Sequence, residues 1–124
     1  METKKRVLMI GLAPEVVDYS LYPGLTRERL TAQLEADEAA LKAMGYDAEQ
    51  FYIDRGETAE AVVTQKLTQN EYACVLIGAG VRANPSTFLL FEKLVNVVHR
   101  HAPSARICFN TKGSDTADAV RRWI

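Results

Sequence analysis

The sequence contains few of the residues on which several common chemistries depend. Its 124 residues include two cysteines and two histidines, and no Cys-x-x-Cys motif occurs. The small number of these residues and the missing motif exclude the usual zinc sites. His99 and His101 lie two positions apart, hence about 200° apart on a helix, so they do not hold a metal jointly. We therefore expect no metal site, and the sequence does not indicate which cofactor the protein would bind.

The chain also lacks strong charge and long apolar runs. Its net charge is -1, which leaves no positive field to hold a nucleic acid backbone. The one basic cluster, Lys4-Lys5-Arg6, is interpreted as a solvated strand start. No apolar run approaches the roughly 18 residues of a membrane span, and no signal-peptide pattern opens the chain. We expect a cytoplasmic protein without nucleic acid or membrane partners.

Alternating β and α patterns run through the whole sequence. They predict one α/β domain over residues 1–124. Apolar or mixed strand patterns occupy 6–11, 47–53, 72–78 and 105–109. Helical patterns occupy 25–44, 57–69 and 85–101, and a last helix is capped by Ser114 or Asp115. Gly45 is expected to end the first helix, and Asn84 to cap the third.

The polarity of the strands predicts their order. The first and third strands are almost wholly apolar and belong in the centre, while the second and fourth carry polar residues and suit the edges. The sequence thus predicts a three-layer sandwich with a four-stranded parallel sheet in the order 2-1-3-4, flavodoxin-like or Rossmann-like. In such sheets ligands bind beyond the carboxyl ends of the strands, here between the first and third.

The long segment 12–24 after the first strand is a candidate part of that site. Connections of this kind usually take about two to six residues. We expect Val16, Val17 and Leu21 to pin the segment to the core, and the alternative is a surface loop with one helical turn. The residues left to face the cleft are Glu15, Asp18, Tyr19, Ser20 and Tyr22, of which Asp18, Tyr19 and Tyr22 are the catalytic candidates.

A glycine-rich segment, 78–83, follows the third strand. It matches G-x-G-x-x-A and so resembles the dinucleotide fingerprint, but the next helix is expected to start late, at Pro85, and the fourth strand ends in Asn110 instead of an acid. Glycines that serve a tight turn are the favoured interpretation. A smaller anion suits Arg82 and the free N–H groups expected near Ser86 and Thr87.

These features define the expected site. The predicted ligand-binding residues are Gly11, Gly78, Gly80, Arg82, Ser86, Asn110 and Lys112. Asp54 and Glu57 also stand near the cleft, and their spacing favours a capping pair. Both histidines and both cysteines are predicted to lie away from the cleft, with the cysteines as buried thiols for which no disulfide is expected. That excludes Ser-His and Cys-His nucleophiles there.

The whole pattern resembles small flavodoxin-like and response-receiver domains. Receivers carry an acid pair after the first strand and a phospho-accepting Asp after the third, where this chain has Gly11-Leu12 and Gly78-Ala79. Thr111-Lys112 matches a receiver's ending, but without the acids the resemblance does not imply phosphotransfer. The chain is also similar to small bacterial proteins of this build, a similarity that implies no function.

Two functions fit the sequence. The first is binding of a small anionic molecule, such as a phosphate or nucleotide, with any catalysis limited to carboxylates and tyrosines. The alternative is a non-catalytic, dimeric interaction module.

A homodimer through the third helix is expected because the apolar positions of this helix cover about 180°, and the short fourth strand leaves an open edge of the sheet. Those positions are Leu90, Phe91, Leu94, Val95, Val97 and Val98, with Leu89 beyond the arc. Alternatively, the last helix, with Val120 and Trp123, covers this surface.

Overall fold

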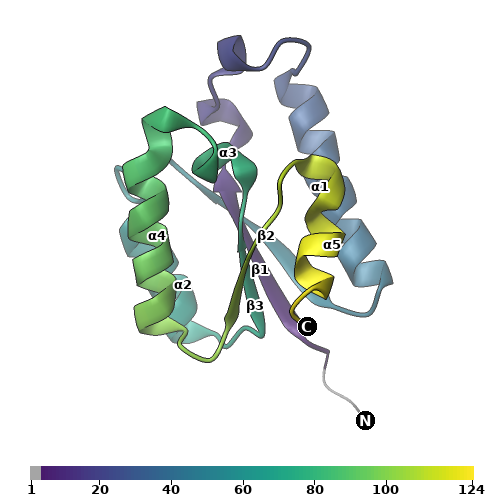
Figure 1. Cartoon of the computed structure of the whole chain (residues 1–124), viewed down its shortest axis with the longest axis vertical. Helices are drawn as coiled ribbons and strands as arrows, with labels where there is room; N and C mark the ends of the chain where they lie inside the picture. Colours follow the sequence, from purple (N-terminus) through teal and green to yellow (C-terminus); the bar gives the residue numbers. More distant parts are fainter. Residues whose placement is uncertain (1–3) are drawn as a thin grey trace.

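A parallel sheet with the strand order β2-β1-β3-β4 forms the centre of the protein (Figure 1). The computed structural model describes residues 4–124. The strands are β1 (Arg6–Leu12), β2 (Asp47–Ile53), β3 (Cys74–Ile77) and β4 (Arg106–Phe109). The predicted fold class and strand order are confirmed. β1 and β3, the two apolar strands, lie in the middle because both their faces are covered.

Helices cover both faces of the sheet. The long helices are α1 (Arg27–Ala43), α2 (Ala59–Gln69) and α4 (Phe88–His101), and a short α5 (Thr116–Arg121) follows β4. In Figure 1, α1 and α5 lie on one side of the sheet, and α2 and α4 on the other. Within residues 4–124, no helix has both the length and the hydropathy needed to cross a bilayer.

The core forms two clusters, one on each face of the sheet. Because side chains alternate along a strand, Leu8 and Ile10 point toward α2 and α4, while Val7 and Met9 point toward α1 and α5. The first cluster is the larger and includes Leu94 of α4, which is fully buried. Both clusters hold the strands in one register, so the four carboxyl ends stay together at one edge.

Local signals fix most helix ends. Thr26 caps α1 through its hydroxyl, which accepts a hydrogen bond from the Arg29 N–H at 3.1 Å. Gly45 follows the same helix with φ +97°, a conformation that favours glycine. Asp54 caps α2, since its carboxylate accepts hydrogen bonds from the N–H groups of Gly56, Thr58 and Ala59. The sequence predicted a capping pair of Asp54 with Glu57, but Glu57 takes no part in these bonds, and Asp54 bonds with Thr58 instead.

The segment after β3 differs from the prediction. A short helix, α3 (Ala79–Arg82), follows β3 directly, and a 3-10 turn, η3 (Pro85–Thr87), precedes α4. Asn84 caps η3 as expected, because its side-chain oxygen accepts from the Ser86 N–H at 2.9 Å. Pro85 explains the break between the two helices, since the residue before a proline is held in extended backbone.

The broad apolar surface of α4 is covered mainly within the chain. Leu94 is buried, and Phe91 and Val95 pack partly buried against the cluster shared with α2. The sequence predicted that the part of this arc beyond one sheet face needs a cover, and α5, the alternative to a second copy, lies on the other face of the sheet and does not supply it. Phe88 and Leu89 remain exposed, by 55% and 75%.

Candidate functional site

Buried polar side chains gather at the carboxyl edge of the sheet. Among residues 4–124, the buried polar residues are Asn84, Thr87, Asn110 and Thr116. All four follow the carboxyl ends of β3 and β4. Burying a polar group costs free energy unless it is hydrogen-bonded, and each of these four side chains has a hydrogen-bond partner within the chain.

Asn110 lies at the centre of this edge. Its Oδ1 accepts a hydrogen bond from the Ala79 N–H at 2.9 Å, and its Nδ2 donates to Thr116 Oγ1 at 3.0 Å. The Thr116 hydroxyl donates to Asp37 Oδ2 on α1 at 3.1 Å. Burial raises the pKa of Asp37. The amide of Asn110, predicted as a ligand contact, thus joins the start of α3 to α5 and α1, and its role is to position them.

Arg82 reaches the same point from α3. Its Nη2 donates a hydrogen bond to the carbonyl oxygen of Asn110. Its Nε is buried and has no hydrogen-bond partner among the described residues. An arginine carries donors on three nitrogens in a fixed plane, so one contact orients the whole group. The structure therefore brings Arg82 and Asn110 together, as the sequence predicted, and leaves one buried guanidinium donor unused.

Arg55 is a contributor that the sequence did not indicate. Its Nη1 donates to the carbonyl oxygen of Val16 at 3.2 Å, and its Nη2 donates to Ser86 Oγ at 2.9 Å. It thus bridges the loop after β1 to the turn before α4. The residues around Arg55 were explained as a helix cap, and no local signal shows how far its side chain reaches.

The loop after β1 folds into two 3-10 turns, η1 (Pro14–Val16) and η2 (Tyr19–Leu21). Val16 and Val17 pack against the first core cluster, as predicted. The prediction for Leu21 was wrong, since 52% of this residue is exposed. Asp18 explains the difference, because its carboxylate accepts from the N–H and hydroxyl of Ser20 and so stabilises η2 without a core contact.

The three catalytic candidates share this loop. The hydrogen bonds from Ser20 lower the pKa of Asp18, so it stays ionised. The Tyr19 hydroxyl donates to the Pro14 carbonyl at 2.7 Å, and burial raises its pKa. Both shifts lead away from neutral pH, whereas an efficient general acid or base has a pKa near it. Tyr22 is half-buried.

The expected glycine contacts are backbone positions with different surroundings. Gly78 lies between β3 and α3, and a Cβ there would lie 3.4 Å from the Ile10 carbonyl oxygen. Gly11 lies within β1, where a Cβ would meet open space, and the same holds for Gly80 in α3. Neither Gly78 nor Gly80 has a positive φ, so the backbone conformation at these two positions does not itself require glycine.

The remaining predicted anion contacts are partly occupied. The N–H groups of Ser86 and Thr87 both bond to Asn84, so the prediction that they are free was wrong. Lys112 is exposed, and its backbone N–H donates to Asp115 at 3.1 Å. Its ammonium group forms no ion pair with the described residues.

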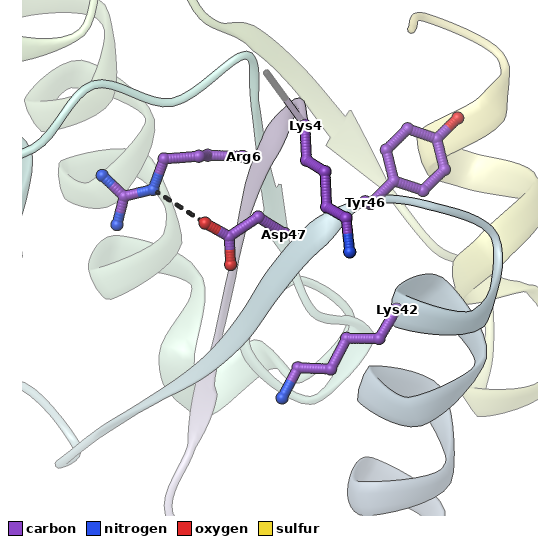
Figure 2. Close-up of a pocket in the computed structure, with 5 residues that line it drawn as sticks. All are labelled: Lys4, Arg6, Lys42, Tyr46 and Asp47. Atoms are coloured by element: carbon purple, nitrogen blue, oxygen red, sulfur yellow. Dashed lines mark ion pairs between the residues drawn. The ribbon is translucent and has the colours of Figure 1, made fainter. Parts of the chain in front are cut away.

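A basic hollow of about 330 Å³ lies at the opposite, amino edge of the sheet (Figure 2). Arg6 there pairs with Asp47 at 3.5 Å, and Lys42 pairs with Glu38 at 3.5 Å. The remaining lining residues are Lys4 and Tyr46. Because two of its three cations already have carboxylate partners, this hollow suits an anion less well than its composition suggests.

A second hollow, of about 430 Å³, also opens at the amino edge, between residues 67–71 and His101. His99 and His101 end α4 at this edge, away from the expected cleft as predicted.

No family model matches the sequence, and no curated protein resembles it significantly.

Proposed function

We propose that the protein binds a small anionic molecule at the carboxyl edge of the sheet, where Arg82 donates to it. The observation that carries this proposal is the buried Nε of Arg82, which has no partner among the described residues. A buried donor left without an acceptor costs about 1–3 kcal/mol, more when charged. A carboxylate or phosphate oxygen relieves that cost.

The surroundings of Arg82 support an anionic ligand. The guanidinium is permanently charged and matches carboxylate and phosphate oxygens in bidentate geometry. The Asn110 carbonyl holds its Nη2, so less side-chain freedom is lost on binding. Lys112 follows β4 at the same edge and adds a second positive charge. Binding, and not acid–base catalysis, is the proposed function because the pKa shifts of Asp18 and Tyr19 disfavour proton transfer at neutral pH.

The test is a thermal-shift measurement with inorganic phosphate, citrate and adenosine monophosphate, each at millimolar concentration. At least one of these anions is expected to raise the Tm, since a ligand that binds only the folded state stabilises it. Arg82→Ala is expected to remove the shift. Arg100→Ala is the matched control because Arg100 is an exposed arginine at the far end of α4.

Arg82→Lys keeps the positive charge and guards against a fold defect in the alanine variant. We expect it to give a weaker shift, because an ammonium group does not reproduce the guanidinium fork. The proposal fails if the wild-type Tm responds to none of the three anions, or if Arg82→Ala and Arg100→Ala respond equally to them.

A second candidate is the dimeric interaction module. The exposed pair Phe88 and Leu89 at the start of α4 favours it, since the rest of that helix's apolar arc is packed. Both residues lie beside the turn that Arg55 contacts through Ser86. A two-fold contact between copies would cover this pair.

A further inference from the structure

The two cysteines lie side by side in the second core cluster. Cys74 belongs to β3 and Cys108 to the neighbouring strand β4, and their Sγ atoms are 3.2 Å apart. Both are buried, 0% and 1% exposed. A disulfide bond is about 2.05 Å long, so the sulfurs need to approach by about 1.2 Å. We infer that Cys74 and Cys108 form a site of reversible oxidation, where a peroxide converts the dithiol into a disulfide across β3 and β4.

The strand register places both thiols on one face of the sheet, and bond formation needs a small shift of the edge strand β4, because diagonal neighbours lie about 7–8 Å apart and disulfides usually join Cα atoms about 4.4–6.8 Å apart. Cys74 pairs with Arg106 and Leu76 with Cys108, so the two cysteines are diagonal neighbours and point to the same face of the sheet. The hydrogen bond between the thiols lowers the pKa of Cys74 and raises that of Cys108. Cys74 is accordingly the thiol that ionises first, and the thiolate is the reactive form.

The oxidant reaches the pair by local opening. β4 is an edge strand of four residues, and within residues 4–124 it pairs only with β3. The cover over the thiols on this face includes Ala119 and Val120 of α5, a helix of six residues. Short elements with few buried contacts open at low free-energy cost, and hydrogen peroxide is small enough to enter through a small opening.

The proposed reaction is balanced in two steps. The Cys74 thiolate attacks one oxygen of hydrogen peroxide, the O–O bond breaks, and the thiol proton leaves with the other oxygen as water. The Cys108 sulfur then attacks the sulfenic sulfur of Cys74. The S–O bond breaks, the S–S bond forms, and the hydroxide leaves with the Cys108 proton as a second water. Two thiols lose two electrons, and one peroxide is reduced to two waters.

The experiment treats the folded protein with hydrogen peroxide and maps its peptides by mass spectrometry without reduction. We expect the intact mass to fall by two hydrogen atoms, with Cys74 and Cys108 in one linked peptide pair. Dithiothreitol is expected to restore the thiols. Hydrogen exchange of the β4 amides should also slow in the oxidised protein, since a bond to β3 restricts opening of the edge strand.

Cys74→Ala and Cys108→Ala are the matched controls, and neither is expected to lose two hydrogens within one chain. The inference is overturned if the folded wild-type protein keeps both thiols under conditions that oxidise the urea-unfolded chain. It is also overturned if peroxide yields only sulfinic or sulfonic acids, or only disulfide-linked dimers.

Discussion

Asn110→Ala tests whether the carboxyl edge is one connected network. The substitution removes the acceptor of the Ala79 N–H and the donor to Thr116 Oγ1. The Ala79 N–H is left without a partner, which costs about 1–3 kcal/mol, whereas the Thr116 hydroxyl keeps its bond to Asp37, so the free energy of unfolding should fall by about 1–3 kcal/mol. In urea, with an m-value of about 2 kcal/mol/M, the midpoint should fall by about 0.5–1.5 M when unfolding is followed by far-UV circular dichroism.

A double-mutant cycle with Thr116→Val separates the network from simple truncation. Thr116→Val removes the hydroxyl that joins Asn110 to Asp37. The double variant should be less destabilised than the sum of the single variants, by about 1 kcal/mol. Asn96→Ala is the control, since this exposed residue bonds only within α4, and it should change stability little. Additive effects of the two substitutions, within about 0.5 kcal/mol, would refute the reasoning.

Two further predictions concern pH and assembly. The pKa of Asp54 is lowered, chiefly by the hydrogen bond from the Thr58 hydroxyl. The carboxylate therefore contributes to stability above its unfolded pKa of about 3.9, and this contribution is lost as pH falls through the folded pKa. Asp54→Asn keeps an acceptor but does not titrate, so its Tm should fall less steeply than that of the wild type between about pH 4 and pH 2. Parallel Tm curves would contradict this. Light scattering at micromolar concentration should give about twice the chain mass of 13.8 kDa, and Leu89→Glu should return it to one chain mass. A wild-type monomer would exclude the dimer.

The sheet could be predicted because burial on both faces leaves a direct mark on the sequence. The apolar runs of β1 and β3 are short and unbroken, whereas Glu49 and Gln50 interrupt β2. That contrast alone separates central from edge strands. The helix ends at Thr26 and Gly45 follow from local hydrogen bonding and backbone conformation, so they too are readable from single residues.

The details of the candidate site depend on contacts between residues far apart in the chain. The first turn of α3 is held by Asn110, which no periodicity around residues 79–82 indicates. Arg55 follows β2 and reaches the turn before α4. The two thiols are in contact only because β4 pairs with β3 in a register that places Cys108 two residues beyond the partner of Cys74. In each case a long-range contact, and not a local propensity, decides the structure.

The central place of β1 has a consequence for how the chain folds as it is synthesised. β1 pairs with β2 on one side, but its other edge pairs with β3, where Val7 meets Cys74. A nascent chain that ends before β3 therefore holds an apolar strand with one edge unpaired. Such an edge can pair with another chain, so this interval is the time at which misassembly is most favoured. Completion of β3 closes this edge before α4, β4 and α5 are synthesised.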